Sequence, residues 1–127
     1  MVDNRPQADQ ILVARLSGAA GRLSRFGALD DEQTVAGAAE LREMAGGRGD
    51  LLAEVAGISL GTSEAKGPEY AARAEAIARL CRAAGADVEA LGEWIEEGRR
   101  RAEAARRRSA GGGMRGGGAR PASRDET

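Results

Sequence analysis

Apolar residues recur every three or four positions between residues 6 and 98, which is the spacing of helices with one buried face. Glycine, proline and aspartate interrupt this pattern at four places, around residues 27–30, 46–50, 61–68 and 85–87. The interruptions divide the region into five segments, each long enough for a short helix. The sequence therefore predicts an all-α fold, a compact bundle of about five short helices with no sheet.

Helix-start signals stand at the beginning of the segments. Asp30 is followed three residues later by Gln33, which is the pattern of a capping box. A proline or an aspartate marks the other expected starts: Pro6, Asp50, Pro68 and Asp87. Glycines mark expected helix ends: Gly27, Gly46 and Gly85. The stretch at 61–67 is the most loop-like part of the body.

The predicted core consists of the inward-facing apolar positions of the five segments. In chain order these are Ile11, Leu12, Leu16, Ala19, Ala20, Leu23, Phe26, Val35, Ala38, Leu41, Met44, Ala45, Leu51, Leu52, Val55, Ile58, Tyr70, Ala74, Ile77, Ala78, Cys81, Ala84, Val88, Leu91, Trp94 and Ile95. Alanine fills many of these positions, which implies closely packed helices and modest stability. Because Cys81 lies on this apolar stripe, we expect a buried structural thiol and not a reactive one.

The apolar pattern ends at Ile95, and no large apolar residue follows until Met114. Three Glu–Arg pairs in the favourable i,i+4 order extend the helical pattern to residue 108: Glu96–Arg100, Glu97–Arg101 and Glu103–Arg107. The Gly/Arg-rich sequence that follows cannot form a core and predicts disorder. The expected organisation is a frayed N-terminus at 1–5, a helical domain at 6–98, a basic helical extension at 99–108 and a disordered C-terminal tail at 109–127.

Charge is divided unevenly along the chain, although the net charge is only −1. Residues 1–98 carry 10 basic and 17 acidic side chains, whereas residues 99–127 carry 9 arginines and 3 acidic side chains. A basic end of this kind can bind an anionic partner, its own acidic body or a second copy. Arginine outnumbers lysine by 18 to 1, which we attribute to high-GC bacterial coding and not to binding.

Side chains that catalysis requires are scarce. The chain has no histidine, which excludes Ser-His and Cys-His nucleophiles and any imidazole metal ligand. The Gly-Arg-Gly-Asp sequence at 47–50 lacks the Lys-Ser/Thr pair of a phosphate-binding loop. Paired carboxylates such as Asp30 and Asp31 lie on expected helix surface. The sequence therefore predicts a protein that is not an enzyme and has no cofactor or metal site.

The cellular compartment is indicated by the single cysteine and by the N-terminus. Cys81 has no second cysteine to pair with, so no internal disulfide can form and a reducing cytoplasm is expected. Asp3 and Asp9 lie near the N-terminus and no apolar run precedes them, which is unlike a signal peptide. No uncharged apolar stretch reaches membrane-spanning length. We expect a cytoplasmic bacterial protein with no membrane partner.

A short pattern surrounds the fourth interruption: a small residue at Cys81, a turn glycine at Gly85, an apolar Leu91 and Trp-Ile-Glu-Glu-Gly-Arg at 94–99. In this pattern residues 80–99 resemble the helix-turn-helix of MerR-like and excisionase-type DNA-binding proteins. The resemblance implies a recognition helix that starts near residue 88. The positions that would face DNA here are Asp87, Glu89, Ala90, Glu93 and Glu97. Because phosphates repel carboxylates, we expect this corner to be retained as architecture only.

The remaining candidates for binding are Arg99, Arg100, Arg101, Arg106, Arg107, Arg108 and Arg115. These side chains can contact phosphates of a nucleic acid without reading its sequence, or they can form a solvated helix surface with a solubilising tail. Two functions stay open. One is a small non-catalytic helical interaction or accessory protein that binds another protein or a second copy. The other is a DNA- or RNA-binding regulatory protein that uses the corner at 80–99, the Arg-rich segment or both.

Overall fold

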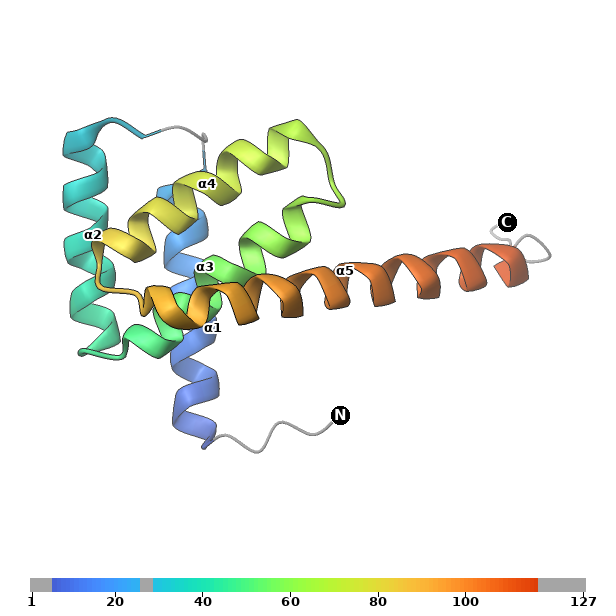
Figure 1. Cartoon of the computed structure of the whole chain (residues 1–127), viewed down its shortest axis with the longest axis horizontal. Helices are drawn as coiled ribbons and strands as arrows, with labels where there is room; N and C mark the ends of the chain where they lie inside the picture. The colour runs from blue at the N-terminus through green and yellow to red at the C-terminus, as the bar shows by residue number, and fades with distance from the viewer. Residues whose placement is uncertain (1–5, 26–28, 117–127) are drawn as a thin grey trace, which may run out of the picture.

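The computed structural model of the chain describes residues 6–25 and 29–116, with the backbone alone at 110–116. Five helices follow one another in it (Figure 1): α1 (Gln7–Leu23), α2 (Asp31–Ala45), α3 (Gly49–Ser63), α4 (Pro68–Ala83) and α5 (Val88–Gly116). The described residues contain no strand, so the predicted all-α fold of five helices is confirmed. The expected core residue Phe26 and the expected helix end Gly27 lie outside the described residues, as do residues 1–5 and 117–127.

The third helix forms the centre of the fold. Helix α3 contacts each of the other four helices, and its residues 51–57 are all buried. A helix that is covered on every side must be apolar all round, and Leu-Leu-Ala-Glu-Val-Ala-Gly meets this requirement except at Glu54. The other helices surround α3 and supply the fully buried side chains of Leu16, Leu41, Leu80 and Cys81. Alanine completes this core at many positions, as the sequence predicts.

Local capping signals fix several helix ends where the sequence places them. The Gln33 backbone N–H donates to Oδ1 of Asp30 at 2.7 Å, and the Asp30 N–H donates to Oε1 of Gln33 at 3.0 Å, which confirms the capping box. Helix α2 ends at Gly46, whose φ of 58° is left-handed. Pro68 occupies the first turn of α4, and Gly85 after α4 has a φ of 106°.

The start of α3 differs from the expected cap at Asp50. The helix begins at Gly49, and Asp50 lies in its first turn, where its carboxylate binds the Arg48 guanidinium at 2.9 Å. A tertiary contact explains the shift. The Asp87 N–H donates to the Gly49 carbonyl at 3.0 Å, and a Cβ at Gly49 would lie 2.5 Å from the Gly85 carbonyl oxygen. Only glycine allows this approach of the two backbones, so its position sets the helix start.

Four residues predicted to face the core are exposed instead. Their exposed fractions are 51% for Ile11, 70% for Val35, 45% for Tyr70 and 63% for Val88. In α2 the buried face is formed by Thr34, Gly37, Ala38, Leu41 and Ala45. Val35 lies about 100° around the helix from Thr34, outside this narrow face. The error arises because small residues such as Gly37, and not the largest apolar side chain, mark where a neighbouring helix lies.

The stretch predicted as a loop from Gly61 is helical as far as Ser63. Gly57 and Gly61 lie one turn apart on α3, and α5 crosses them. A Cβ at Gly57 would lie 2.8 Å from the Trp94 carbonyl carbon, and one at Gly61 would lie 2.7 Å from the backbone nitrogen of Arg99. From the other side, a Cβ at Gly98 would lie 2.7 Å from the Ile58 carbonyl oxygen. We call this backbone contact between Gly57, Gly61 and Gly98 the glycine seam.

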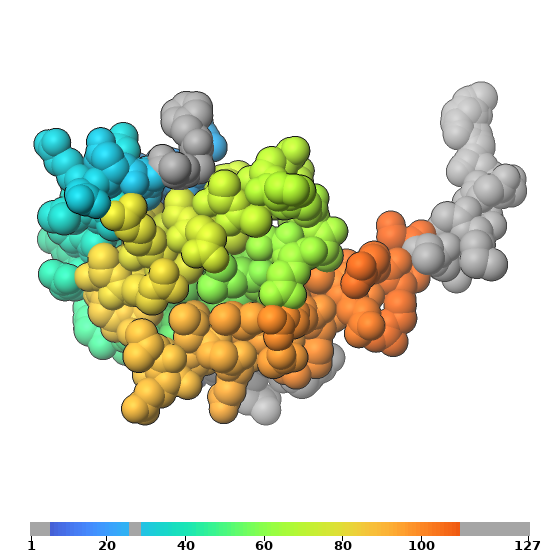
Figure 2. Space-filling model, turned by 45° about the horizontal axis from the view of Figure 1, so that its top comes forward, coloured from blue at the N-terminus to red at the C-terminus, as the bar shows by residue number. Residues whose placement is uncertain are grey.

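The C-terminal part of α5 extends beyond the other four helices. Figure 1 shows α5 as one unbroken helix, and Figure 2 shows the last coloured segment of α5, in orange, standing clear of the body. The expected domain boundary at residue 98 therefore falls inside a single helix of 29 residues. The predicted basic extension at 99–108 is helical, and the helix continues to Gly116.

The Cys81 thiol should be unreactive in the native protein. The side chain is fully buried, and this burial raises the pKa of Cys81 to about 12. A rise from 9.0 to about 12 lowers the thiolate fraction near neutral pH roughly a thousandfold, even before steric protection. We expect a thiol-disulfide reagent at mildly alkaline pH to label the native chain far more slowly than the urea-unfolded chain. Equal labelling rates would contradict the burial of this thiol.

Candidate nucleic-acid interface

A metal ion or a small ligand would bind the body through a cluster of ligating side chains or through a cleft. Among the described residues, no group of three or more acidic or cysteine side chains is arranged to hold a metal ion. A cleft of about 200 Å³ lies between the end of α3 and the start of α4 and is lined by Ser59, Thr62, Ser63, Lys66, Tyr70, Arg73, Ala74 and Ile77. This volume is below the range of about 300–1,000 Å³ that is usual for ligand pockets.

The polar groups of this cleft are largely occupied by the protein itself. The Thr62 hydroxyl donates to the Ile58 carbonyl at 2.8 Å, and the Ser63 hydroxyl donates to the Leu60 carbonyl at 2.9 Å. Arg73 donates to the Gly21 carbonyl at 2.9 Å. These bonds fix helix ends and the contact between α4 and the end of α1.

All seven candidate arginines lie on α5, but the structure separates them into two groups. We call Arg99, Arg100 and Arg101 the proximal arginines, and Arg106, Arg107 and Arg108 the distal arginines. Both groups are exposed. Arg115 lies further along the same helix, where the structure describes the backbone alone. The two groups differ in what their guanidinium groups contact.

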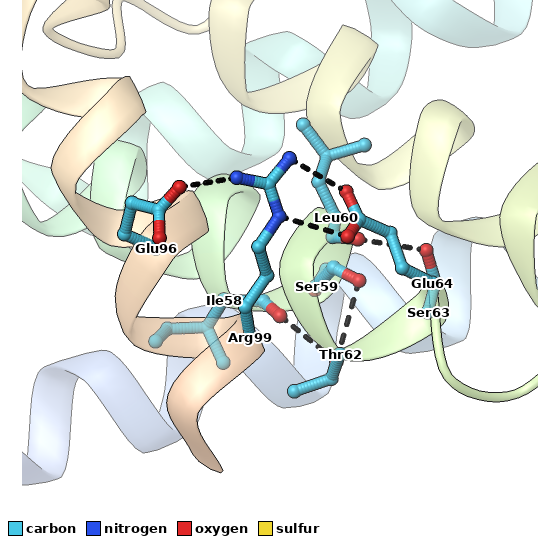
Figure 3. A network of polar contacts seen from close by, with 8 residues as sticks. All are labelled: Ile58, Ser59, Leu60, Thr62, Ser63, Glu64, Glu96 and Arg99. Atoms are coloured by element: carbon cyan, nitrogen blue, oxygen red, sulfur yellow. Dashed lines mark hydrogen bonds and ion pairs between the residues drawn. The ribbon is translucent and has the colours of Figure 1, made fainter. Parts of the chain in front are cut away.

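Arg99 connects α5 to the end of α3. Its Nε donates to Oε1 of Glu64 at 2.8 Å and its Nη2 to Oε2 at 3.0 Å, so the pair is bidentate (Figure 3). Its Nη1 also pairs with Glu96 on its own helix. The hydrogen bonds that Arg99 donates hold the pKa of Glu64 below its ordinary value, and acceptance of these bonds by Glu64 and Glu96 raises the pKa of Arg99. Arg99 is thus engaged by two carboxylates.

Arg100 and Arg101 share one carboxylate. Arg100 Nη2 lies 2.6 Å from Oε1 of Glu97, and Arg101 Nε lies 3.0 Å from Oε2 of the same residue. Hydrogen bonds from Arg100 and then Arg101 lower the pKa of Glu97. The predicted Glu97–Arg101 pair is confirmed. The predicted Glu96–Arg100 pair was wrong. Arg100 pairs with Glu97 at i,i+3, and Glu96 pairs with Arg99.

The distal arginines have fewer partners. Arg107 pairs with Glu103 at 3.1 Å, which confirms the predicted pair. Arg106 and Arg108 form no ion pair with any side chain that the structure describes. The last ion pair between α5 and another element, among the described side chains, is Arg99–Glu64. The distal arginines therefore present charge that the body does not neutralise.

The corner that resembles a helix-turn-helix is present as two helices joined by a short turn. Helix α4 ends at Ala83 and α5 begins at Val88, with the left-handed Gly85 between them. Asp87 accepts a hydrogen bond from the Glu89 N–H at 3.1 Å, as expected of a residue that caps α5. Trp94 packs on Gly57 of α3, and the exposed positions Asp87, Glu89 and Glu93 are acidic.

The Glu64–Arg99 pair was not foreseen from the sequence. The two residues are 35 positions apart, and Glu64 lies in the stretch predicted as a loop, so no local spacing connects them. The Gly57-xxx-Gly61 spacing was the available signal, because two small residues one turn apart permit a close helix crossing.

The described part of the chain contains no helix that is both long enough and apolar enough to cross a membrane. Comparisons with known protein families, with characterised proteins and with solved structures find no match for this chain.

Proposed function

We propose that this chain is a small non-catalytic binding protein, bacterial and cytoplasmic. A basic helix projects from its helical body at 6–98 and binds an anionic partner. The observation that carries the proposal is the projection of α5 beyond the body with Arg106 and Arg108 unpaired among the described side chains. A partner must supply negative charge to complement this surface. The partner is another protein or a second copy of the chain, which has an acidic body.

The character of the body supports a role without catalysis. The sequence has no histidine, and its one thiol is buried with a raised pKa. The hydroxyls of Thr62 and Ser63 in the cleft are bonded to backbone carbonyls. A nucleophile needs a neighbouring base or a lowered pKa, whereas these hydroxyls donate to backbone carbonyls and the pKa of the thiol is raised. The free thiol is also what supports a reducing compartment.

The second candidate function is nucleic-acid binding, through the corner at 80–99, the Arg-rich segment or both. The specific observation that favours it is the density of guanidinium groups on the projecting helix, because arginine is well suited to phosphate oxygens. The acidic positions of the corner favour the Arg-rich segment over the corner as the contacting element.

Truncation after Arg101 tests the proposed function. This cut keeps the Arg99–Glu64 pair and the glycine seam and removes the distal arginines. Three defined partners are offered at low and high salt: a second copy by sedimentation, polyglutamate, and duplex DNA by fluorescence anisotropy. We expect the full chain to bind at least one of them and the truncated chain to lose that binding while its urea midpoint is unchanged. Binding that survives truncation would place the function in the body instead.

A further inference from the structure

We propose that the distal arginines of α5 bind the phosphate backbone of double-stranded DNA with the helix lying in the major groove, while the proximal arginines serve the fold. This inference rests on the second candidate function, nucleic-acid binding, and names the class of nucleic acid that the same projecting helix binds. It assigns different roles to two Arg-Arg-Arg triplets that are identical in sequence. The division follows from their contacts. The arc of the distal side chains and the residues around them then indicate which polyanion they bind.

The first argument is the balance of charge around each triplet. Three carboxylates, those of Glu64, Glu96 and Glu97, pair with the three proximal arginines. A phosphate would have to displace these contacts, one of which is bidentate. Only Glu103 pairs with a distal arginine, so two guanidinium groups remain available to a phosphate among the described residues. A polyanion can therefore form more new ion pairs with the distal arginines than with the proximal arginines.

The second argument is the direction of the distal side chains. Successive residues of a helix point about 100° apart, so Arg106, Arg107 and Arg108 cover about 200° of its circumference. A flat surface can meet only part of such an arc. A groove with a charged wall on each side can meet all of it. The major groove of B-DNA is about 12 Å wide and admits a helix, with phosphates along both edges.

The third argument is the thinness of the helix around the triplet. The neighbours of the distal arginines are small except for Glu103, with Ala102, Ala104, Ala105 and Ser109 on either side. A helix of this kind can lie deep in a groove, with the long arginine side chains reaching out to the walls. Its one carboxylate here, Glu103, is paired with Arg107 and it carries no amide, so binding is expected to be independent of sequence.

Other anionic surfaces fit these features less well. Double-stranded RNA has a deep, narrow major groove that does not admit the helix. A membrane-surface helix needs an apolar face, and no large apolar residue lies between Ile95 and Met114. An acidic protein surface would be met by one side of the triplet only. Duplex DNA is the polyanion that engages the whole arc.

Two double variants that remove the same charge test the division. Arg106→Gln with Arg108→Gln removes two unpaired arginines, and Arg100→Gln with Arg101→Gln removes two paired ones. Binding to a duplex of mixed sequence is measured by fluorescence anisotropy over a series of salt concentrations. The slope of log affinity against log salt is negative, and each lost phosphate contact makes it less steep by about 0.9. We expect the slope of the distal variant to be less steep than that of the parent by about 2, and the slope of the proximal variant to be nearly unchanged.

The outcomes separate this inference from the proposed function. Equal slope changes in the two variants would overturn the division, and duplex RNA of the same sequence that binds as tightly as DNA would overturn the placement of the helix in the major groove. A full chain that binds polyglutamate or itself but not DNA would overturn the inference and leave the proposed function standing. A chain that binds none of the three would overturn both. The circular dichroism of each variant, expected to match the parent, shows that a loss of binding is not a loss of fold.

Discussion

Replacement of Gly61 by leucine should lower the free energy of unfolding by about 3 kcal/mol. A Cβ at this position would lie 2.7 Å from the Arg99 nitrogen and closer still to the Ile95 carbonyl oxygen. Both are backbone atoms, so no change of rotamer relieves the overlap, and α5 must move away from α3. Leucine is the better helix former by roughly 0.8–1 kcal/mol. A loss of stability would therefore arise from the overlap with α5 at the glycine seam and not from helix propensity.

The matched control is the same change at Gly92. This residue is exposed on α5 and a Cβ there would meet no atom within 4 Å. Gly92→Leu should raise the free energy of unfolding by about 0.5–1 kcal/mol, because helix propensity is the only term that changes. Urea denaturation followed by circular dichroism measures both variants. If the two substitutions shift the midpoint in the same direction, the backbone contact between α3 and α5 is not a determinant of stability.

Replacement of Trp94 by alanine should cost about 3 kcal/mol of unfolding free energy. The side chain is partly buried and packs against the core, and its Cβ lies over Gly57. Alanine keeps the Cβ and loses the indole, so the cost measures the packing of the ring. Because Trp94 is the sole tryptophan, unfolding is followed by circular dichroism and not by fluorescence.

Val88→Ala is the control for this substitution. Val88 is on the same helix but exposed, so its truncation should change the unfolding free energy by no more than about 0.5 kcal/mol. An unchanged urea midpoint for Trp94→Ala would mean that the corner between α4 and α5 is not part of the core.

Features that depend on neighbouring residues could be predicted from the sequence. The capping box at Asp30 and the proline at the start of α4 are local signals, and the structure places both as expected. The number and order of helices follow from them. The position of α3 at the centre, by contrast, depends on how all five helices pack, and no single window of sequence contains that information.

Glycine was the main source of error. A glycine that ends a helix and a glycine that admits a crossing helix are identical residues, and only the partner helix distinguishes Gly46 from Gly61. For the same reason Val35 was assigned to the core, although the buried face of α2 passes through Gly37.

The candidate arginines were located from the sequence, but their division into two groups was not. The i,i+4 rule found Glu97–Arg101 and Glu103–Arg107 because those pairs lie within one helix. Glu64 lies on another element, so its contact with Arg99 exists only in the folded chain. Two triplets of the same composition thus differ in a way that composition does not reveal.

The continuity of α5 couples the folding of the body to the shape of its projecting end. An isolated helix is costly to begin in water because its first turn fixes several residues for a single hydrogen bond. Residues 99–116 need no nucleus of their own, since they propagate a helix that the seam with α3 already holds. Opening of the seam therefore removes the nucleus from which the helix of the projecting segment extends. By thermodynamic linkage, a ligand that binds only the helical form of that segment stabilises the body against unfolding, at a distance and without touching it.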